Sequence, residues 1–213
     1  MLTTRIHLMV VTARNSLPRP LQAHINPNLL ANEVGLLTAA LCDQLGWVQA
    51  AILRLVQAAL LHDIGKSRLP TSLWSKPESL TEQEWALARQ HTQLGYALLK
   101  DQQDPMLEVA AEVALYHHER FDGSGYPYQL QGKRIPLSAR IVGICDVYDA
   151  LRSRRSYKPG LSHQRALQII YEGDGRTHPN HFDPLILECF REVAQHVETL
   201  PQYEKDQLPS AVG

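Results

Sequence analysis

The chain has 213 residues, of which 44% are hydrophobic and 20% are charged, as in a globular protein that is long enough to bury a large core. The formal net charge of −1 excludes a global field that attracts duplex nucleic acid or a membrane, so an anionic ligand must meet a local group of cations. Three widely spaced cysteines (Cys42, Cys145 and Cys189) and the lack of an 18-residue apolar run predict a reduced, cytoplasmic protein without a spanning helix.

The N-terminal segment is predicted to be an irregular arm over residues 1–28, because three prolines interrupt it, with a possible short strand over Arg5–Val11. Leucine and valine then recur at helical spacing from about residue 29 to residue 45. Gly46 follows, and glycine is the residue that commonly ends a helix. A second helical pattern runs from Val48 to His62 and stops at Gly65.

Helix-capping residues divide the rest of the chain. Thr81 and Glu84 predict a capping box for a helix over 81–99, and Asp104-Pro105 predicts the start of a helix that reaches 118. A loop rich in glycine and proline follows over 119–137. Three further helices are predicted over 138–151, 162–171 and from 184, with Ser138, Ser162 and Asp183 as their caps. The sequence thus predicts one all-α domain over 29–200 and a loose tail over 201–213.

Titratable side chains lie on the inward faces of these predicted helices. His91 shares the apolar stripe of 81–99, His117 and His118 follow the stripes of 105–118, and Asp146 shares a face with Val142. The pair His62-Asp63 ends the second helix. Buried groups of this kind are costly unless they are paired or bound to a metal.

One inward histidine is more often a satisfied core residue than a ligand, but six such residues together favour a metal site. Histidine and aspartate suit iron, manganese, zinc, cobalt or nickel. Six ligands are too many for one tetrahedral site and suit two metals that share a bridging carboxylate. The other histidines are predicted to lie at the surface or in loops, and two of them, His178 and His181, could line a pocket; the full set is His7, His24, His163, His178, His181 and His196.

Three motifs carry a resemblance to a known family: LLHDIGK around residue 62, HHERFDGSGYP from residue 117 and ARIVGICDVYDAL from residue 139. Together they resemble the HD-GYP domain, a bacterial branch of the HD phosphohydrolases, over about 29–195. The resemblance implies a helical bundle with a metal site between helices and hydrolysis of cyclic di-GMP to pGpG, in some members on to GMP. It implies that Asp63 bridges two metals, for which iron or manganese is expected. His62 and Asp146 would hold one metal, and His91, His117 and His118 the other.

The resemblance also implies a substrate site and a partner site. Lys66 would assist phosphate binding or protonate the leaving group, and Arg155 and Lys158 would clamp phosphate, although the run from Arg152 to Lys158 could simply be a solvated basic segment. A loop formed by Gly123, Gly125, Tyr126 and Pro127 would dock on a GGDEF-domain protein; the alternative for Tyr126 is an anchor that packs on the core.

One departure weakens the catalytic expectation. Members of the family commonly carry a glutamate and a histidine on their first helix, and the ungapped match places Asn26 and Leu30 there. His24 or Glu33 could replace them. A second hypothesis is therefore a catalytically weak protein that binds cyclic di-GMP or a GGDEF partner as an adaptor. A third, an enzyme of mononucleotides or alarmones, is disfavoured by the GYP loop.

Overall fold

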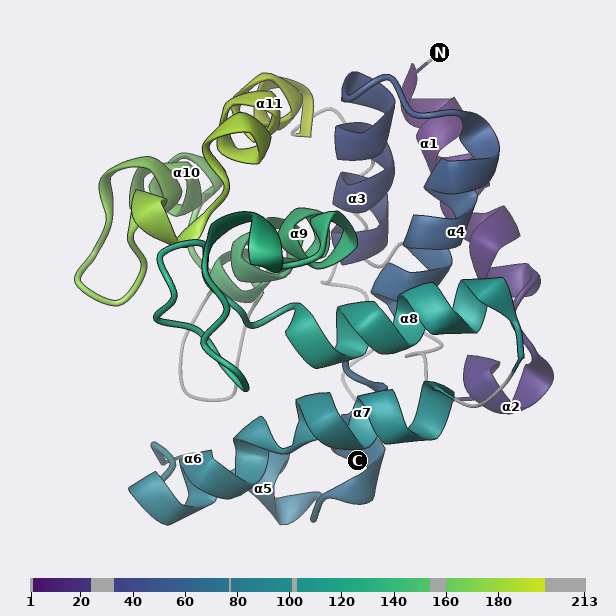
Figure 1. Ribbon diagram of the computed structural model, residues 1–213. Coiled ribbons are helices and arrows are strands. Elements are labelled where there is room, and N and C mark those ends of the chain that lie inside the picture. The colour runs from purple at the N-terminus through teal and green to yellow at the C-terminus, as the bar shows by residue number, and fades with distance from the viewer. Residues whose placement is uncertain (1, 24–32, 77, 101–102, 154–159, 198–213) are drawn as a thin grey trace, which may run out of the picture.

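The computed structural model describes residues 2–23, 33–76, 78–100, 103–153 and 160–197. Every regular element in these ranges is helical, which confirms the predicted all-α class (Figure 1). The α-helices and 3-10 helices are α1 (Leu2–Asn15), α2 (Arg19–Gln22), α3 (Glu33–Gln44), α4 (Gln49–Leu60), η1 (Ile64–Arg68), α5 (Ser72–Ser75), α6 (Glu82–Arg89), α7 (His91–Leu99), α8 (Pro105–Tyr116), η2 (Gly132–Arg134), α9 (Leu137–Arg152), α10 (His163–Glu172), η3 (Pro179–His181) and α11 (Pro184–Val197).

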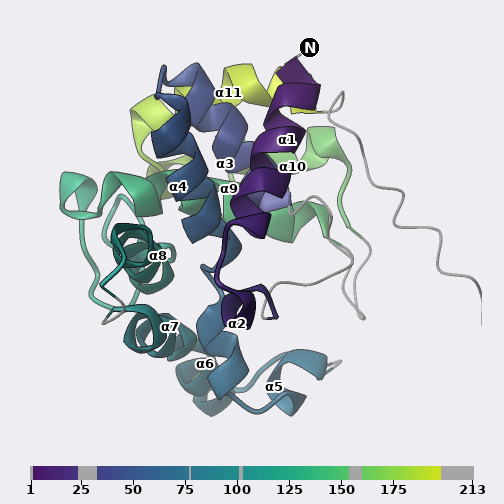
Figure 2. The same ribbon diagram turned by 90° about the vertical axis from the view of Figure 1, so that its right-hand side faces the viewer.

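The main core forms around α3 and α4. Helix α3 contacts α1, α4, α9 and α11, while α4 also contacts α8. Leu41, Ile52 and Val56 are completely buried between them. The helices α5, α6 and α7 lie at the opposite end of the molecule from α11 (Figures 1 and 2), where Leu69, Leu73 and Ala88 form a second, smaller cluster. The candidate site lies where these two parts meet.

The predicted strand over Arg5–Val11 is wrong, because Leu2–Asn15 forms helix α1. Apolar side chains at helical spacing explain this: Ile6, Met9, Val10 and Ala13 are buried in the main core. This part of the predicted arm therefore packs against α3 and α4. The prolines that suggested an irregular segment lie after the helix has ended.

Most predicted helix ends are confirmed. The Thr81 hydroxyl accepts from the amide of Glu84, whose carboxylate accepts in turn from the Thr81 amide. Asp104, Ser162 and Asp183 each accept an amide hydrogen bond from the first turn that follows. After α3, Gly46 adopts a positive φ of 75° while the Trp47 amide donates to the Cys42 carbonyl, which is the glycine-terminated helix end that the sequence predicts.

Two predicted elements need correction. The helix expected over 81–99 is broken at Gln90 into α6 and α7. At the break the Thr92 hydroxyl donates to the Arg89 carbonyl, a bond of the kind that bends helices. Helix α9 begins at Leu137 without a side-chain cap, and the Ser138 hydroxyl donates instead to the Glu112 carboxylate. The predicted tail over 201–213 lies outside the described residues.

The three cysteines are free thiols, as predicted; Cys42 and Cys145 are buried and Cys189 is partly buried. Within the described ranges, no helix combines the length and the apolar character that crossing a bilayer requires.

Candidate functional site

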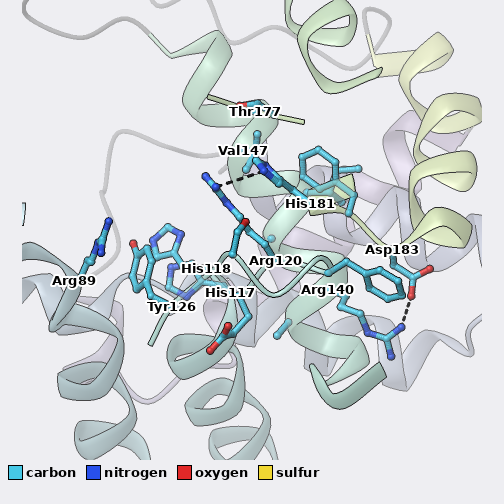
Figure 3. A pocket seen from close by; sticks show the side chains of 17 residues that line it. Arg89, His117, His118, Arg120, Tyr126, Arg140, Val147, Thr177, His181 and Asp183 are labelled. Atoms are coloured by element: carbon cyan, nitrogen blue, oxygen red, sulfur yellow. Dashed lines mark hydrogen bonds and ion pairs between the residues drawn. The ribbon is translucent and has the colours of Figure 1, made fainter. Parts of the chain in front are cut away.

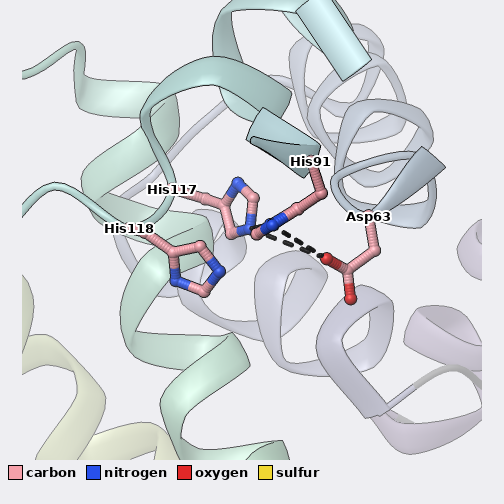
Figure 4. A group of neighbouring side chains, drawn as sticks. All are labelled: Asp63, His91, His117 and His118. Atoms are coloured by element: carbon pink, nitrogen blue, oxygen red, sulfur yellow. Dashed lines mark hydrogen bonds and ion pairs between the residues drawn. The ribbon is translucent and has the colours of Figure 1, made fainter. Parts of the chain in front are cut away.

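The structure brings all six predicted metal ligands together, five of them at the ends of helices. His62 and Asp63 follow α4, His91 begins α7, His117 and His118 follow α8, and Asp146 lies within α9. Their donor atoms form two overlapping groups, within each of which all distances are at most 4.8 Å. Asp63, His91, His117 and His118 form one group (Figure 4). His62, His117 and Asp146 form the other.

Backbone carbonyl groups orient three of the histidine rings. The Nδ1 atom of His62 lies 2.7 Å from the Ala59 carbonyl, that of His91 lies 2.8 Å from the Ala88 carbonyl, and that of His117 lies 3.0 Å from the carbonyl of residue 113. A carbonyl oxygen can only accept, so each Nδ1 carries a proton, and in the neutral rings of His91 and His117 each Nε2 then presents a lone pair. Such hydrogen bonds fix the orientation of histidines that bind metals.

The free lone pairs face one another and a carboxylate. Nε2 of His91 lies 3.5 Å from Nε2 of His117 and 3.4 Å from Oδ1 of Asp63. This Asp63 oxygen is buried and has no hydrogen-bond partner within the described structure. A buried acceptor that faces other acceptors is unfavourable unless a cation lies between them. The residues therefore fit a divalent transition metal.

The charges of the side chains around the cluster also favour a bound cation. Nε2 of His62 lies 3.3 Å from Asp63 and 3.5 Å from Asp146. Burial alone would lower the pKa of His62, but these two carboxylates raise it well above its ordinary value. Burial lowers the pKa of His118 to about 4 and holds that of His117 well below its ordinary value. The chain thus surrounds two carboxylates mainly with neutral imidazoles, an environment that favours added positive charge.

Close backbone contacts at glycine residues hold the ligands together. A β-carbon on Gly65 would lie 1.9 Å from the His91 carbonyl oxygen, and one on Gly143 would lie 2.8 Å from that of His117. Only glycine permits these approaches. Gly65 therefore lets the turn after His62 and Asp63 press directly on the first turn of α7.

The loop over 122–127 folds back on the cluster of candidate ligands. The Tyr126 ring stacks on His118, with centroids 4.8 Å apart and planes 30° apart (Figure 3). Gly125 is buried so closely against the backbone of residues 118–120 that a β-carbon there would lie 2.3 Å from the Arg120 amide nitrogen. Gly123 adopts a positive φ of 86°. These contacts support the anchoring role for Tyr126, and they place its ring beside the candidate ligand His118.

An open groove of about 860 Å³ borders the cluster. Its walls include Lys66, whose ammonium forms an ion pair with Asp63 and lies 5.1 Å from the centroid of the Trp74 ring. The lining also includes side chains that the sequence interpretation missed: Trp74, Glu82, Trp85, Arg89 and Arg120. Arg89 and Arg120 each stand two positions from a predicted ligand, His91 and His118 respectively, which is the signal that could have identified them.

Behind the loop lies a smaller pocket of about 160 Å³. His181 lines it, as the sequence suggested, and its ring contacts Arg120 at 3.5 Å (Figure 3).

The prediction that His163 lies at the surface is wrong, because its ring is buried against the Tyr148 hydroxyl at 2.6 Å. The missed Glu119 is also buried, and its carboxylate accepts from the amides of Tyr128 and Leu130 to hold the chain after the loop.

Several predicted residues lie outside the described ranges, so the structure gives no position for them: His24, Asn26, Leu30, Arg155 and Lys158. Glu33 is described, and one oxygen of its carboxylate is buried without a partner there. The two groups of candidate ligands within the described ranges do not include it.

The comparisons with known proteins agree with this geometry. The family model of the HD domain matches residues 11–186. A cyclic di-GMP phosphodiesterase of Vibrio cholerae is 43% identical over 157 residues, which cover 71% of this chain and 31% of the relative. A 3′3′-cGAMP-specific phosphodiesterase of the same organism is 42% identical over 135 residues, 63% of this chain and 25% of the relative. The chain therefore spans less than a third of either relative.

A similar fold occurs in a solved structure, an HDG"Y"P protein from Bdellovibrio bacteriovorus. Its TM-score is 0.60 at 22% identity, and the match covers 78% of this chain and 50% of that protein. The helical arrangement, the clustered histidines and aspartates, and a family model that matches most of the sequence agree. The chain belongs to the HD-domain family.

Proposed function

We propose that this chain is a metal-dependent phosphodiesterase that hydrolyses cyclic di-GMP to pGpG, and further to GMP if the linear product rebinds. The observation that carries the proposal is the buried cluster of converging lone pairs around Asp63 Oδ1, directly beside a groove whose lining includes Lys66, Arg89 and Arg120. The activity printed for the Vibrio cholerae relative supports the choice of substrate.

The six clustered residues would hold two divalent metals, with iron or manganese expected for this set of ligands. Bound there, the metals would supply Lewis-acid charge for a phosphoryl group and lower the pKa of a water molecule. Asp63 lies in contact with ligands of both groups, which supports a bridging role for its carboxylate.

Lys66 is the chain's own candidate for proton transfer. Its ammonium is held between the Asp63 carboxylate and the Trp74 ring, and it faces the groove. In that position it can donate a hydrogen bond to a phosphate oxygen or protonate the departing ribose oxygen.

Arg89 and Arg120 supply further positive charge in the groove. Arg155 and Lys158 remain predicted phosphate contacts. A GGDEF-domain partner on the loop of residues 123–127 and a cytoplasmic location also stay predictions.

The proposal is tested by incubating protein purified without oxygen with cyclic di-GMP and separating the products chromatographically. The wild-type chain should yield pGpG. Lys66→Met should keep its metal but turn over about a hundredfold more slowly, as is typical for loss of a general acid. Lys133→Met, which removes an exposed lysine outside the groove, should behave as wild type. A metal-replete chain that leaves cyclic di-GMP intact contradicts the proposal.

A second prediction concerns Asn26 and Leu30. If these positions correspond to the glutamate and histidine of the family, the double variant Asn26→Glu, Leu30→His should gain metal ligands. We expect tighter retention of metal against a chelator, or a third metal equivalent, together with faster turnover. Elemental analysis before and after dialysis against chelator measures this. A folded double variant with unchanged metal content and turnover would show that the first-helix match is out of register.

A further inference from the structure

One wall of the groove carries two side chains that the proposed chemistry does not use, Glu82 and Trp85. Along α6, Glu82, Trp85 and Arg89 all line it. Residues three, four and seven positions apart lie on one face of a helix, so these three side chains form a single stripe. The helices α5 and α6, which carry the two groove tryptophans, lie side by side at one end of the molecule (Figures 1 and 2).

The stripe has a defined direction relative to the metals. Arg89 is at the metal end, because its guanidinium lies 5.1 Å from the centroid of the Tyr126 ring, which stacks on His118 (Figure 3). A helix rises about 1.5 Å per residue, so Trp85 follows about 6 Å farther out and Glu82 about 10 Å farther out. A nucleotide has the same order of parts: phosphate, then ribose, then the face and the edge of its base.

Both tryptophans are exposed to an unusual degree for such large apolar side chains, Trp74 at 39% and Trp85 at 50%. The small core beneath α6 is completed without them, by Leu69, Leu73 and Ala88 with their neighbours. Trp74 is already engaged, because one side faces Lys66 and its ring contacts His91 edge to face. Trp85 makes no ring contact within the described part of the chain, so its face is open to the groove.

Glu82 gives this wall its chemical preference. A carboxylate only accepts hydrogen bonds. The Watson–Crick edge of guanine presents two adjacent donors, N1–H and the exocyclic amino group, whereas that of adenine presents one donor beside an acceptor. A carboxylate can thus accept two bonds from guanine, but with adenine it faces a lone pair. Two such bonds to one ionised group give strong and directional recognition.

We infer that Trp85 and Glu82 form a purine-base subsite, in which Trp85 stacks on one base of the substrate and Glu82 selects guanine over adenine. The inference rests on the proposed function for its substrate class. Such a subsite would give the chain a preference for one base. The groove would bind the base through Trp85 and Glu82, and it would bind the phosphates separately through Lys66, Arg89 and Arg120.

The test measures binding and does not depend on turnover. Isothermal titration of the metal-loaded full chain with GMP and with AMP gives two dissociation constants. We expect wild type to bind GMP about tenfold more tightly than AMP. Glu82→Gln should abolish most of that preference, because loss of a charge-assisted hydrogen bond weakens binding by about tenfold or more. Trp85→Ala should weaken both nucleotides by about tenfold, as expected for loss of base stacking, and Trp85→Phe should restore much of the affinity.

Glu108→Gln is the matched control, because it removes the same charge from an exposed position in the first turn of α8, outside the groove lining. It should bind both nucleotides as wild type does. Equal affinities of wild type for GMP and AMP, or an unchanged preference in Glu82→Gln, overturn the inference. A retained guanine preference in a chain that does not cleave cyclic di-GMP would refute the proposed function and leave the subsite standing. If the chain cleaves cyclic di-GMP but Glu82→Gln leaves its relative affinity for GMP and AMP unchanged, the proposed function stands and the subsite is refuted.

Discussion

Asp63→Asn is expected to lose most of its bound metal and to hydrolyse cyclic di-GMP at least about a hundredfold more slowly than wild type. Mutation of a residue that only hydrogen-bonds to a metal ligand commonly lowers metal affinity or activity by about 10–100-fold. Asp63 is proposed to bind the metals directly, so its loss should have an effect at least this large. Its Oδ1 faces His91 and His117 and its Oδ2 faces His62, so a neutral amide weakens both groups of ligands. Elemental analysis of protein purified without oxygen measures the loss.

Asp104→Asn provides the control for this substitution. Asp104 caps α8, and asparagine caps a helix as well as aspartate does. The control should keep its metal and its turnover. If Asp63→Asn retains the wild-type metal content while folded, the carboxylate does not bridge the two groups and the proposed ligand arrangement is wrong.

Gly65→Ala is expected to lower the free energy of unfolding by about 3 kcal/mol, at the upper end of the usual cost of overpacking. The new β-carbon would lie 1.9 Å from the His91 carbonyl oxygen and 2.5 Å from the Gly95 amide nitrogen. Both are backbone atoms, so η1 must move away from α7 and carry Asp63 away from His91. For a chain of this size the shift in Tm should be roughly 6–12 °C.

Thermal unfolding in the presence of chelator separates this effect from that of lost metal. Gly35→Ala is the comparison, because a β-carbon at this position in the first turn of α3 meets only side chains, the nearest at 3.4 Å. That variant should be as stable as wild type or slightly more so, since alanine favours helix over glycine. Equal Tm values for Gly65→Ala and wild type would show that the close approach of η1 and α7 is not required.

The sequence predicts the helices and their caps well because these depend on neighbouring residues. Asp104, Ser162 and Gly46 each end or begin a helix through contacts within a few positions. The inward faces of the same helices also predict which histidines meet. The N-terminal helix is harder to predict, because the helical spacing of Ile6, Met9 and Ala13 is followed directly by Pro18 and Pro20, which are typical of an irregular segment.

What the sequence does not predict depends on contacts between distant segments. The stacking of Tyr126 on His118 and the position of Trp85 beside the groove arise from packing between elements. These features complete the site, and three-dimensional coordinates are required to find them. The histidine tautomers are a local exception, since each ring nitrogen meets a backbone carbonyl three or four positions earlier in the chain.

The most direct test of the central claim is an anomalous-difference map from crystals of protein prepared without oxygen, collected at the absorption edge of the metal that elemental analysis identifies. The account predicts two peaks within the cluster, one beside His62 and Asp146, the other beside His91, His117 and His118, with Asp63 between them. Typical separations in such pairs are ~3.5–4 Å. A cluster without metal in protein shown to be folded, or a single ion that Asp63 does not contact, would contradict the account.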